Sequence, residues 1–574
     1  MHSRRPRSDR TCQSAWIAAA LLWPVAAFAA APPGEKVTVL DPVFVEASPV
    51  ASGAAGIPWQ YFTVPGFEII SRCPNAFNEA YAQALERATA ARLAFLPAEF
   101  WGELPTPIKI VMYNRPPDPR EGAVQLNPID LTWSSEDSAI LGSDSVLLSH
   151  PLTLGDGDTY INCGNYWDIQ SGLSDFSVDV DSAILIESRV PHLPAWFIAG
   201  TVGQCGLFSH RAIRSALLGY VAVLPNAIWT TTDDTLAIQQ EAARTAKGRE
   251  KPRVRMLPPI DELLHNSGSR DQRDLWNAES ALLVRWGLFG SGKRQAFLDF
   301  VDQATREPVS EAMFRRFLGF GYVEAQRRLG EYLPDAASHS ITFPIAVPDR
   351  EDLEIRDATS TEVARIVGDW GRLEGKAAGS LQFDYRRECL EQADVLFERI
   401  AARKEKDPLF LAAFGLYEFL TTDNVRARDA LEAAASAGVV RPRAYVELAR
   451  LRLQAALPGI SEGIGDLNEA EFRGVVGLLT TARIQMPSLL GGYFLLARTL
   501  EHAPTRPSRE DLWPLRQAVR LFPQNAALAY KVATLYRRFG YGDDAAAIVS
   551  RAQGFAESDN DRFLLAAFSA EGSR

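Results

Sequence analysis

Two hydrophobic patterns divide the chain, and the first consists of short apolar runs that alternate with helical periods. Tyr61–Val64 and Phe67–Ile70 are apolar runs on either side of Pro65-Gly66, which predicts a hairpin. Apolar residues then recur at helical spacing from Asn75 to Leu96, and Pro107–Met112 reads as a further strand. This order of elements indicates an α+β domain at the start of the folded chain.

The rest of the first half mixes weak strand signals with amphipathic helices. Short strands are predicted at Ser145–Leu148 and Tyr160–Cys163, and helical patterns resume near Asp181. Three later helices are predicted at these ranges: Asn277–Trp286, Arg294–Ala304 and Glu311–Phe317.

The second pattern begins near residue 358, where the chain becomes almost entirely helical. Pairs of one large and one small residue recur at intervals of 34, 48 and 36 residues: Phe414-Gly415, Leu448-Ala449, Leu496-Ala497 and Val532-Ala533. Small residues also recur in the partner helices, at Ala434, Ala482, Ala518 and Ala552. The longest interval contains an insertion near residues 458–468. Such a period predicts paired helices that stack on their neighbours.

The repeated positions resemble the tetratricopeptide repeat, which has a period of 34 residues. The resemblance implies an all-α superhelical array whose first helices line a concave groove for a protein or peptide. A row of arginines on those helices suggests a carboxylate-bearing partner, because guanidinium binds carboxylate in a bidentate manner. Ordinary solvated or intra-repeat salt-bridging arginines are the alternative. The candidate groove residues are Arg450, Phe494, Arg498, Tyr530, Thr534 and Arg537.

A segment of the α+β half resembles the peptidase-MA-like branch of the gluzincin metallopeptidases. In that family a helix with H-E-x-x-H leads into a P-x-W-x-x-E-G segment, and here Leu193–Gly200 reads L-P-A-W-F-I-A-G. In the best register, Ile186 and Val190 replace the two zinc-ligating histidines, and Ala199 replaces the third ligand. Glu187 alone remains, at the position of the general base. The resemblance therefore implies an inactive peptidase-like domain without metal or other cofactor, because apolar side chains cannot hold a divalent ion.

Two other functions remain open at this stage. One is an active metal-dependent peptidase with an unrecognised site, such as His192 and His210 with an acid. The other is an envelope polysaccharide-binding protein that uses some of the 12 Trp and 15 Tyr as stacking platforms. That function predicts exposed aromatic residues clustered in one groove, whereas an adaptor predicts that most of them lie in the core.

The N-terminus reads as a bacterial signal peptide, which implies a periplasmic or secreted protein. Four arginines precede the apolar run Ala15–Ala27, and Ala27-Phe28-Ala29 fits a cleavage site after Ala29. No later stretch is long and apolar enough to predict a membrane span. The expected organisation is a signal peptide at 1–29, a leader at 30–58, the peptidase-like domain at 59–335, a connector at 336–357 and the repeats at 358–574.

Charge and cysteine content narrow the remaining choices. The full chain has a net charge of −11, and removal of residues 1–29 with four arginines and one aspartate changes it to −14. This acidic balance argues against a nucleic-acid partner. Cys73, Cys163, Cys205 and Cys389 remain after cleavage. They allow one disulfide in an oxidising compartment, or buried thiols, and no pairing is favoured.

Overall fold

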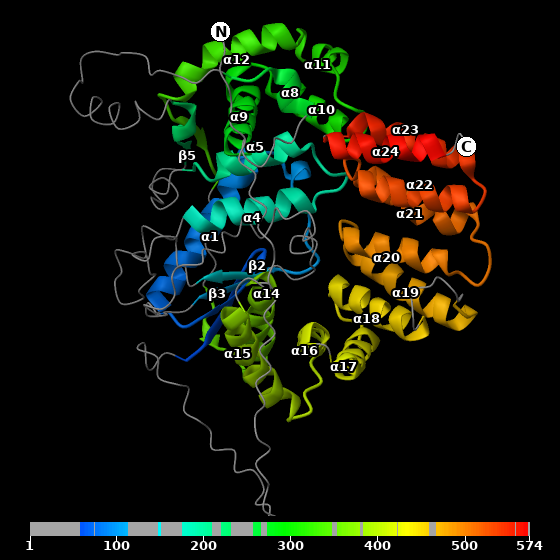
Figure 1. The fold of residues 1–574 in the computed structure, drawn as a ribbon. Coiled ribbons are helices and arrows are strands. Elements are labelled where there is room, and N and C mark those ends of the chain that lie inside the picture. Colours follow the sequence, from blue (N-terminus) through cyan, green and yellow to red (C-terminus); the bar gives the residue numbers. More distant parts are fainter. Residues whose placement is uncertain are drawn as a thin grey trace, which may run out of the picture. The chain divides into compact units, whose positions relative to one another are not determined.

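A mixed sheet forms around the predicted hairpin (Figure 1). The computed structural model describes residues 58–73, 75–112, 147–150, 175–208, 220–230, 257–265, 273–346, 353–378, 383–421, 423–457, 467–556 and 558–571. All of them belong to one compact unit, Ser52–Arg574. The predicted signal peptide and leader, and the strand predicted at 160–163, lie outside the described residues.

The sheet has five strands in the order β4-β3-β2-β1-β7. β1 (Gln60–Val64) and β2 (Phe67–Ser71) form the predicted antiparallel hairpin, and Gly66 takes a φ of 85° at its turn. β3 (Ile108–Met112) and β4 (Leu147–His150) continue the sheet in parallel, while β7 (Arg356–Asp357) pairs with β1. The segment predicted as a connector therefore contributes a strand to the sheet.

Helices cover both faces of this sheet, which explains why every residue of β2 and β3 is buried. Phe67 and Ile69 belong to a core with residues of α1 (Asn75–Phe95) and α4 (Asp175–Ser188). Ile70 points to the other face, where it packs with Val111 and with Ile366 from the C-terminal half. The first helices of that half thus complete the layer over the sheet.

A second, larger core joins the remaining helices of the first half. α5 (Ala195–Cys205) packs closely on α9 (Arg273–Arg285), because Gly200 leaves space for the backbone of Ser280. A Cβ atom at Gly200 would lie 2.5 Å from the Ser280 carbonyl oxygen. The other elements of this part are η1 (Ala98–Phe100), β5 (Tyr220–Val223), η2 (Ala227–Trp229), α8 (Ile260–His265), η4 (Trp286–Gly290), α10 (Arg294–Ala304), α11 (Glu311–Leu318), α12 (Tyr322–Ala336) and β6 (Ile341–Pro344). β5 and β6 form a separate two-stranded antiparallel sheet.

The C-terminal half consists of helices in successive antiparallel pairs (Figure 1). It starts with α13 (Ser360–Val363), the π-helical turn η5 (Ala364–Gly368) and α14 (Asp369–Ala378), which pair with α15 (Phe383–Ala401). The following helices are α16 (Pro408–Thr421), α17 (Asn424–Ser436), α18 (Pro442–Ala456), α19 (Glu469–Gln485), α20 (Leu490–Glu501), α21 (Arg509–Leu521), α22 (Ala526–Arg538), α23 (Gly542–Phe555) and α24 (Asp559–Glu571). No helix in the described ranges is both long and apolar enough to cross a membrane.

The small residues of the predicted period lie where paired helices meet. Ala449, Ala497 and Ala533 have no exposed surface, and a Cβ atom at Gly415 would lie 2.7 Å from the Leu431 side chain. The partner-helix residues Ala434, Ala482, Ala518 and Ala552 are buried as well. The first helices α14, α16, α18, α20, α22 and α24 each contact the next one in this series. The helical content of the C-terminal half is thus compatible with the predicted helical array.

Candidate functional site

The segment that resembles a zinc site ends its helix early. α4 stops at Ser188, so Val190 lies in the connection to α5 and does not share a helix face with Ile186. Ile186 is fully buried and Ala199 of α5 is 4% exposed, both in the larger core of the first half. The three positions that the family would use for ligands therefore carry hydrocarbon, and two of them are packed in the core.

Glu187 is a half-buried carboxyl group near the end of α4. It has no hydrogen bond or ion pair with any residue that the structure describes. Burial, without a compensating positive charge, raises its pKa to about 8. Burial thus favours the protonated form of this carboxyl group over a wider pH range than in water.

Histidines and acids do not converge elsewhere in the described part of the chain. No group of three or more His, Cys, Asp or Glu side chains there is placed to hold a metal ion. His192 lies in the α4–α5 connection, with its ring against Phe522 of the C-terminal half, and His210 lies outside the described residues. Cys73, Cys205 and Cys389 are buried, no disulfide links them to one another, and Cys163 also lies outside these residues.

Only part of the predicted arginine row is available for a ligand. The Arg450 guanidinium donates to Glu447 over 2.7 Å, and Arg443 binds the same buried carboxylate over 2.7 Å. Arg498 on α20 is half-buried, and no described residue forms a hydrogen bond or ion pair with it. Phe494, one turn earlier, packs partly into the core of the array.

The remaining three candidates lie together on α22, and two of them, Tyr530 and Arg537, contact Phe568 of α24. The Arg537 guanidinium lies 4.0 Å from the centre of the Phe568 ring and donates to the Phe568 carbonyl over 3.1 Å. The Tyr530 ring meets Phe568 edge-on at 5.9 Å, and the Thr534 hydroxyl donates to the Tyr530 carbonyl over 2.8 Å. Arg537 and Tyr530 thus join the last helix to α22, and Arg498 remains as the arginine of the predicted row without a partner among the described residues.

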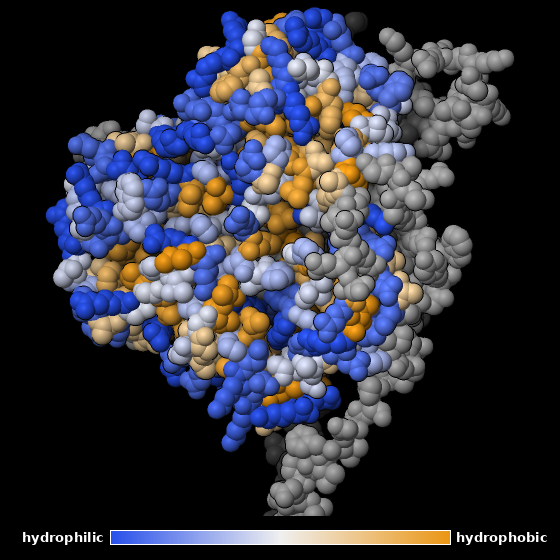
Figure 2. Space-filling model, turned by 180° about the vertical axis from the view of Figure 1, so that it is seen from behind, coloured by the Kyte–Doolittle hydropathy of each residue, from blue (hydrophilic) through white to orange (hydrophobic). Residues whose placement is uncertain are grey.

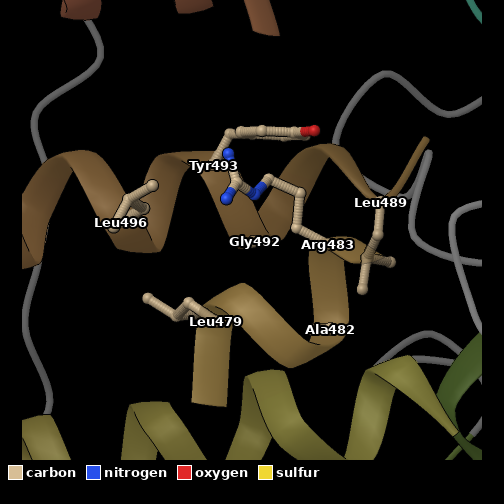
Figure 3. Close-up of a pocket in the computed structure, with 7 residues that line it drawn as sticks. All are labelled: Leu479, Ala482, Arg483, Leu489, Gly492, Tyr493 and Leu496. Carbon is tan, nitrogen blue, oxygen red and sulfur yellow. The ribbon is translucent and has the colours of Figure 1, made fainter. Parts of the chain in front are cut away.

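A small cavity that the sequence did not indicate lies between α19 and α20 (Figure 3). Its volume of about 10 Å³ holds about one water molecule. Figure 3 shows Arg483 extending toward Tyr493 beside the apolar lining, which includes Leu479, Leu489 and Leu496. Burial raises the pKa of Tyr493 to about 12, although the positive charge of Arg483 acts in the opposite direction.

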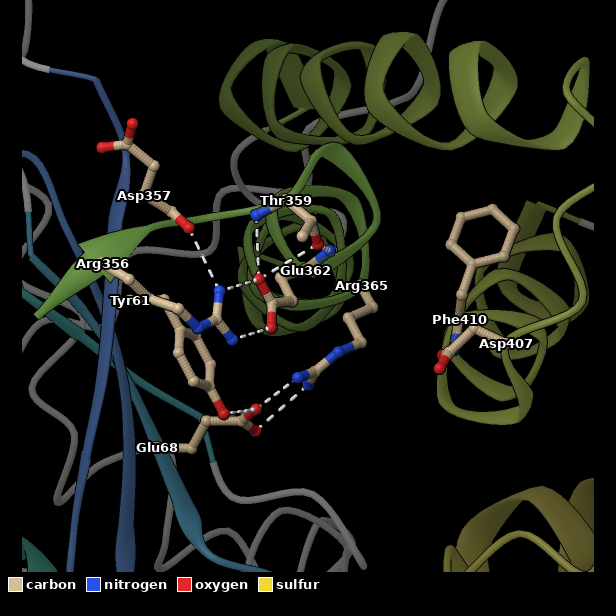
Figure 4. Close-up of polar contacts among 9 residues, drawn as sticks. All are labelled: Tyr61, Glu68, Arg356, Asp357, Thr359, Glu362, Arg365, Asp407 and Phe410. Atoms are coloured by element: carbon tan, nitrogen blue, oxygen red, sulfur yellow. Dashed lines mark hydrogen bonds and ion pairs between the residues drawn. The ribbon is translucent and has the colours of Figure 1, made fainter. Parts of the chain in front are cut away.

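A cluster of buried charges joins the sheet to the start of the C-terminal half (Figure 4). Arg365 of η5 donates two hydrogen bonds to Glu68 of β2, and Tyr61 donates to the same carboxylate over 2.8 Å. Burial alone would raise the pKa of Glu68, but the hydrogen bonds and charge of Arg365 outweigh it and hold this pKa below its usual range. At the rim of the cluster, Glu362 accepts hydrogen bonds from Arg356.

The buried charges continue from the sheet into the array. Asp369 of α14 accepts from Arg372 over 2.7 Å and from Arg441, before α18, over 2.6 Å. Lys109, the β3 neighbour of Glu68, is also buried, and burial followed by the charge of Arg441 lowers its pKa to about 8. In the sequence, this cluster was indicated only by one charged residue within each of two mostly apolar strands, Glu68 in β2 and Lys109 in β3. Such pairs favour one docking geometry more than they add stability.

Further contacts join the α4–α5 connection to the end of the array. The backbone N–H of His192 donates to the Leu521 carbonyl over 2.8 Å, and the Gln524 side chain donates to the Leu193 carbonyl over 3.4 Å. The Arg551 side chain of α23 donates to the Arg306 carbonyl over 2.8 Å. The N-terminal half therefore contacts both the first and the last helical pairs of the C-terminal half.

Most of the described tryptophans lie in the core. The buried ones are Trp101, Trp196, Trp229, Trp276 and Trp286. Trp513 on α21 is 48% exposed, and it contacts Arg520 at 5.8 Å. Figure 2 shows one face of the molecule, on which hydrophobic residues form separate small groups among hydrophilic ones.

The chain was compared with protein-family models and with curated protein sequences. No protein-family model matches the chain, and no curated protein sequence matches it.

Proposed function

We propose that this protein is an exported, non-catalytic adaptor with a peptidase-like α+β domain and a tetratricopeptide-like array. The array binds a protein or peptide along its first helices, and the partner carries a carboxylate. The observation that carries this proposal is the succession of paired helices with small buried residues at each crossing, together with the contact of each first helix with the next. Such an arrangement presents one continuous surface to an extended ligand.

Arg498 is the residue on this surface that is best placed to bind a ligand. Arg450 and Arg537 already bind groups of the chain itself, whereas Arg498 has no partner among the described residues. A half-buried guanidinium without an anion retains its full capacity for bidentate binding. A carboxylate supplied by another molecule fits it both in charge and in geometry.

The peptidase-like part supports a loss of catalysis in this proposal. The positions of Ile186, Val190 and Ala199 offer no donor atoms, and Val190 lies beyond the end of α4. Glu187 retains the carboxyl group, but it has no charged partner among the described residues. This part would therefore serve as a support for the array through the cluster of Glu68 and Arg365.

A binding experiment with the purified chain from residue 30 tests the proposal. Fluorescent decapeptides with free C-terminal carboxylates, and the same peptides with amidated ends, are titrated against the protein by fluorescence anisotropy. We expect binders among the free acids. We expect R498A to weaken their affinity about 10- to 150-fold, since a charged hydrogen bond is worth about 1.5–3 kcal/mol.

The matched control is R473A, because Arg473 lies on a second helix of the array, is 75% exposed and pairs only with Glu469. This variant should bind as the wild type does. Equal affinity of R498A and wild type would contradict the role of the groove. Stoichiometric zinc in the purified protein, with peptide cleavage that stops on chelation, would overturn the adaptor proposal and favour the active peptidase.

A further inference from the structure

The connection between α4 and α5 is a contact element in its own right. Residues 189–194 reach the turn between α21 and α22 through two backbone carbonyls, those of Leu521 and Leu193. Between these two hydrogen bonds the His192 ring meets the edge of Phe522, with 4.7 Å between ring centres and 67° between planes. Phe522 is 3% exposed and also contacts Tyr493 at 5.9 Å, so His192 extends an aromatic group of the array core.

His192 fits this place only as a neutral ring. Its Nε2 atom is buried and has no hydrogen-bond partner. The charged group that acts on the ring is Arg189 of the same connection, while Leu521, Phe522 and Gln524 on the opposite side do not titrate. Burial, followed by the like charge of Arg189, lowers the pKa of His192 to about 4.

Arg189 cannot easily move away from a protonated ring. Its guanidinium donates to Asp302 over 2.9 Å and to the Pro191 carbonyl over 2.7 Å. A proton on His192 would therefore leave a second positive charge in a buried place, without an acceptor for the new N–H group. The contact with the array loses stability in this state.

We propose that residues 189–194 form a latch that holds the α21–α22 turn while His192 is neutral and releases it when His192 is protonated. The release concerns the α21–α22 turn, because the hydrogen bond from Arg551 of α23 to the Arg306 carbonyl does not involve His192. The first pair also stays attached, because Glu68 and Arg365 keep their charges in mild acid. Acid thus loosens this turn while the first pair remains on the sheet. This inference does not depend on the ligand of the groove.

The direction of the pH dependence follows from the pKa of His192 in the closed and in the released state. The pKa of His192 is lowered in the closed state, so the contact is at full strength above about pH 6.5, the value for a free imidazole, and weakens as the pH falls toward about 4. Between pH 7 and pH 5 the two pKa values shift the equilibrium toward release roughly 20-fold.

Hydrogen–deuterium exchange of the full chain at pH 7.5 and pH 5, corrected for intrinsic rates, tests the latch. We expect protection of residues 519–526 to fall at least tenfold at pH 5, while strands β2 and β3 keep theirs. The variant H192F retains a ring for Phe522 without titrating and should show no such fall. The control H339Q changes a histidine that is 62% exposed and should behave as the wild type does.

Two results would overturn the latch. One is an unchanged protection of residues 519–526 in the wild-type protein at pH 5, and this measurement stands even if H192F does not fold. The other is an equal fall in the wild type and in a folded H192F variant, which would assign the pH response to other groups.

Discussion

The closest approach between α16 and α17 offers a sharp test of the repeated helical pairs. Gly415 lies at this crossing, where a new Cβ atom would be 2.7 Å from the Leu431 side chain and 3.2 Å from the Ala427 carbonyl oxygen. The leucine side chain can turn aside, but the carbonyl belongs to the backbone of α17 and cannot. The substitution G415A therefore forces the two helices apart or leaves the new methyl group compressed.

Two opposing effects determine how G415A changes the free energy of unfolding. Replacement of glycine by alanine inside a helix stabilises it by about 1 kcal/mol. Overpacking at a closely packed site costs about 1–3 kcal/mol, and contact with backbone favours the upper half of this range. We expect a net loss of about 1–2 kcal/mol, the opposite sign to the intrinsic preference of the helix.

The matched control is G477A on α19, where a Cβ atom meets nothing within 4 Å. This variant should be more stable than the wild type by about 0.5–1 kcal/mol, because only the higher helix propensity of alanine acts there. Urea unfolding followed by circular dichroism measures both variants against the wild type. A stability of G415A equal to or above that of G477A would refute the close packing at this crossing, and with it the physical reason for the small residues in the period.

Two further perturbations probe the carboxyl groups of the first half. E68Q leaves Arg365 buried without its anion and should lower the free energy of unfolding by about 3 kcal/mol. The surface variant R473A should lower it by no more than about 0.5 kcal/mol. Urea midpoints that shift equally for both variants would contradict this account. Glu187 has a raised pKa in the folded state, so its contribution is present below about pH 4.5 and is lost as the pH rises toward about 8. Because glutamine does not titrate, E187Q should be more stable than the wild type by about 2 kcal/mol at pH 8 and nearly equal to it at pH 5. This figure is smaller than the pKa shift alone would give, because water partly screens a half-buried group. A wild-type advantage at pH 8 would mean that the carboxylate has a partner that favours its charge.

The candidate site shows where prediction from the sequence ended. The apolar side chains of Ile186 and Ala199 could be read directly from the sequence, and the structure buries both of them. The sequence did not indicate that α4 ends before Val190, because helix ends depend on what packs around them. The arginine row was predicted from equivalent positions in successive helical pairs. Such a period cannot show that Arg537 binds a carbonyl of α24, whereas Arg498 has no partner among the described residues.

What the sequence determined by itself was local. The turn at Pro65-Gly66, the helix Arg294–Ala304 and the small residue at Gly415 all follow from preferences that act within a few residues. Only the tertiary structure decided that Glu68 meets Arg365, which lies 297 residues further along the chain, and that His192 reaches Phe522. Pairings of this kind depend on how whole layers pack, and no local pattern encodes the partner that a buried charge or ring will find.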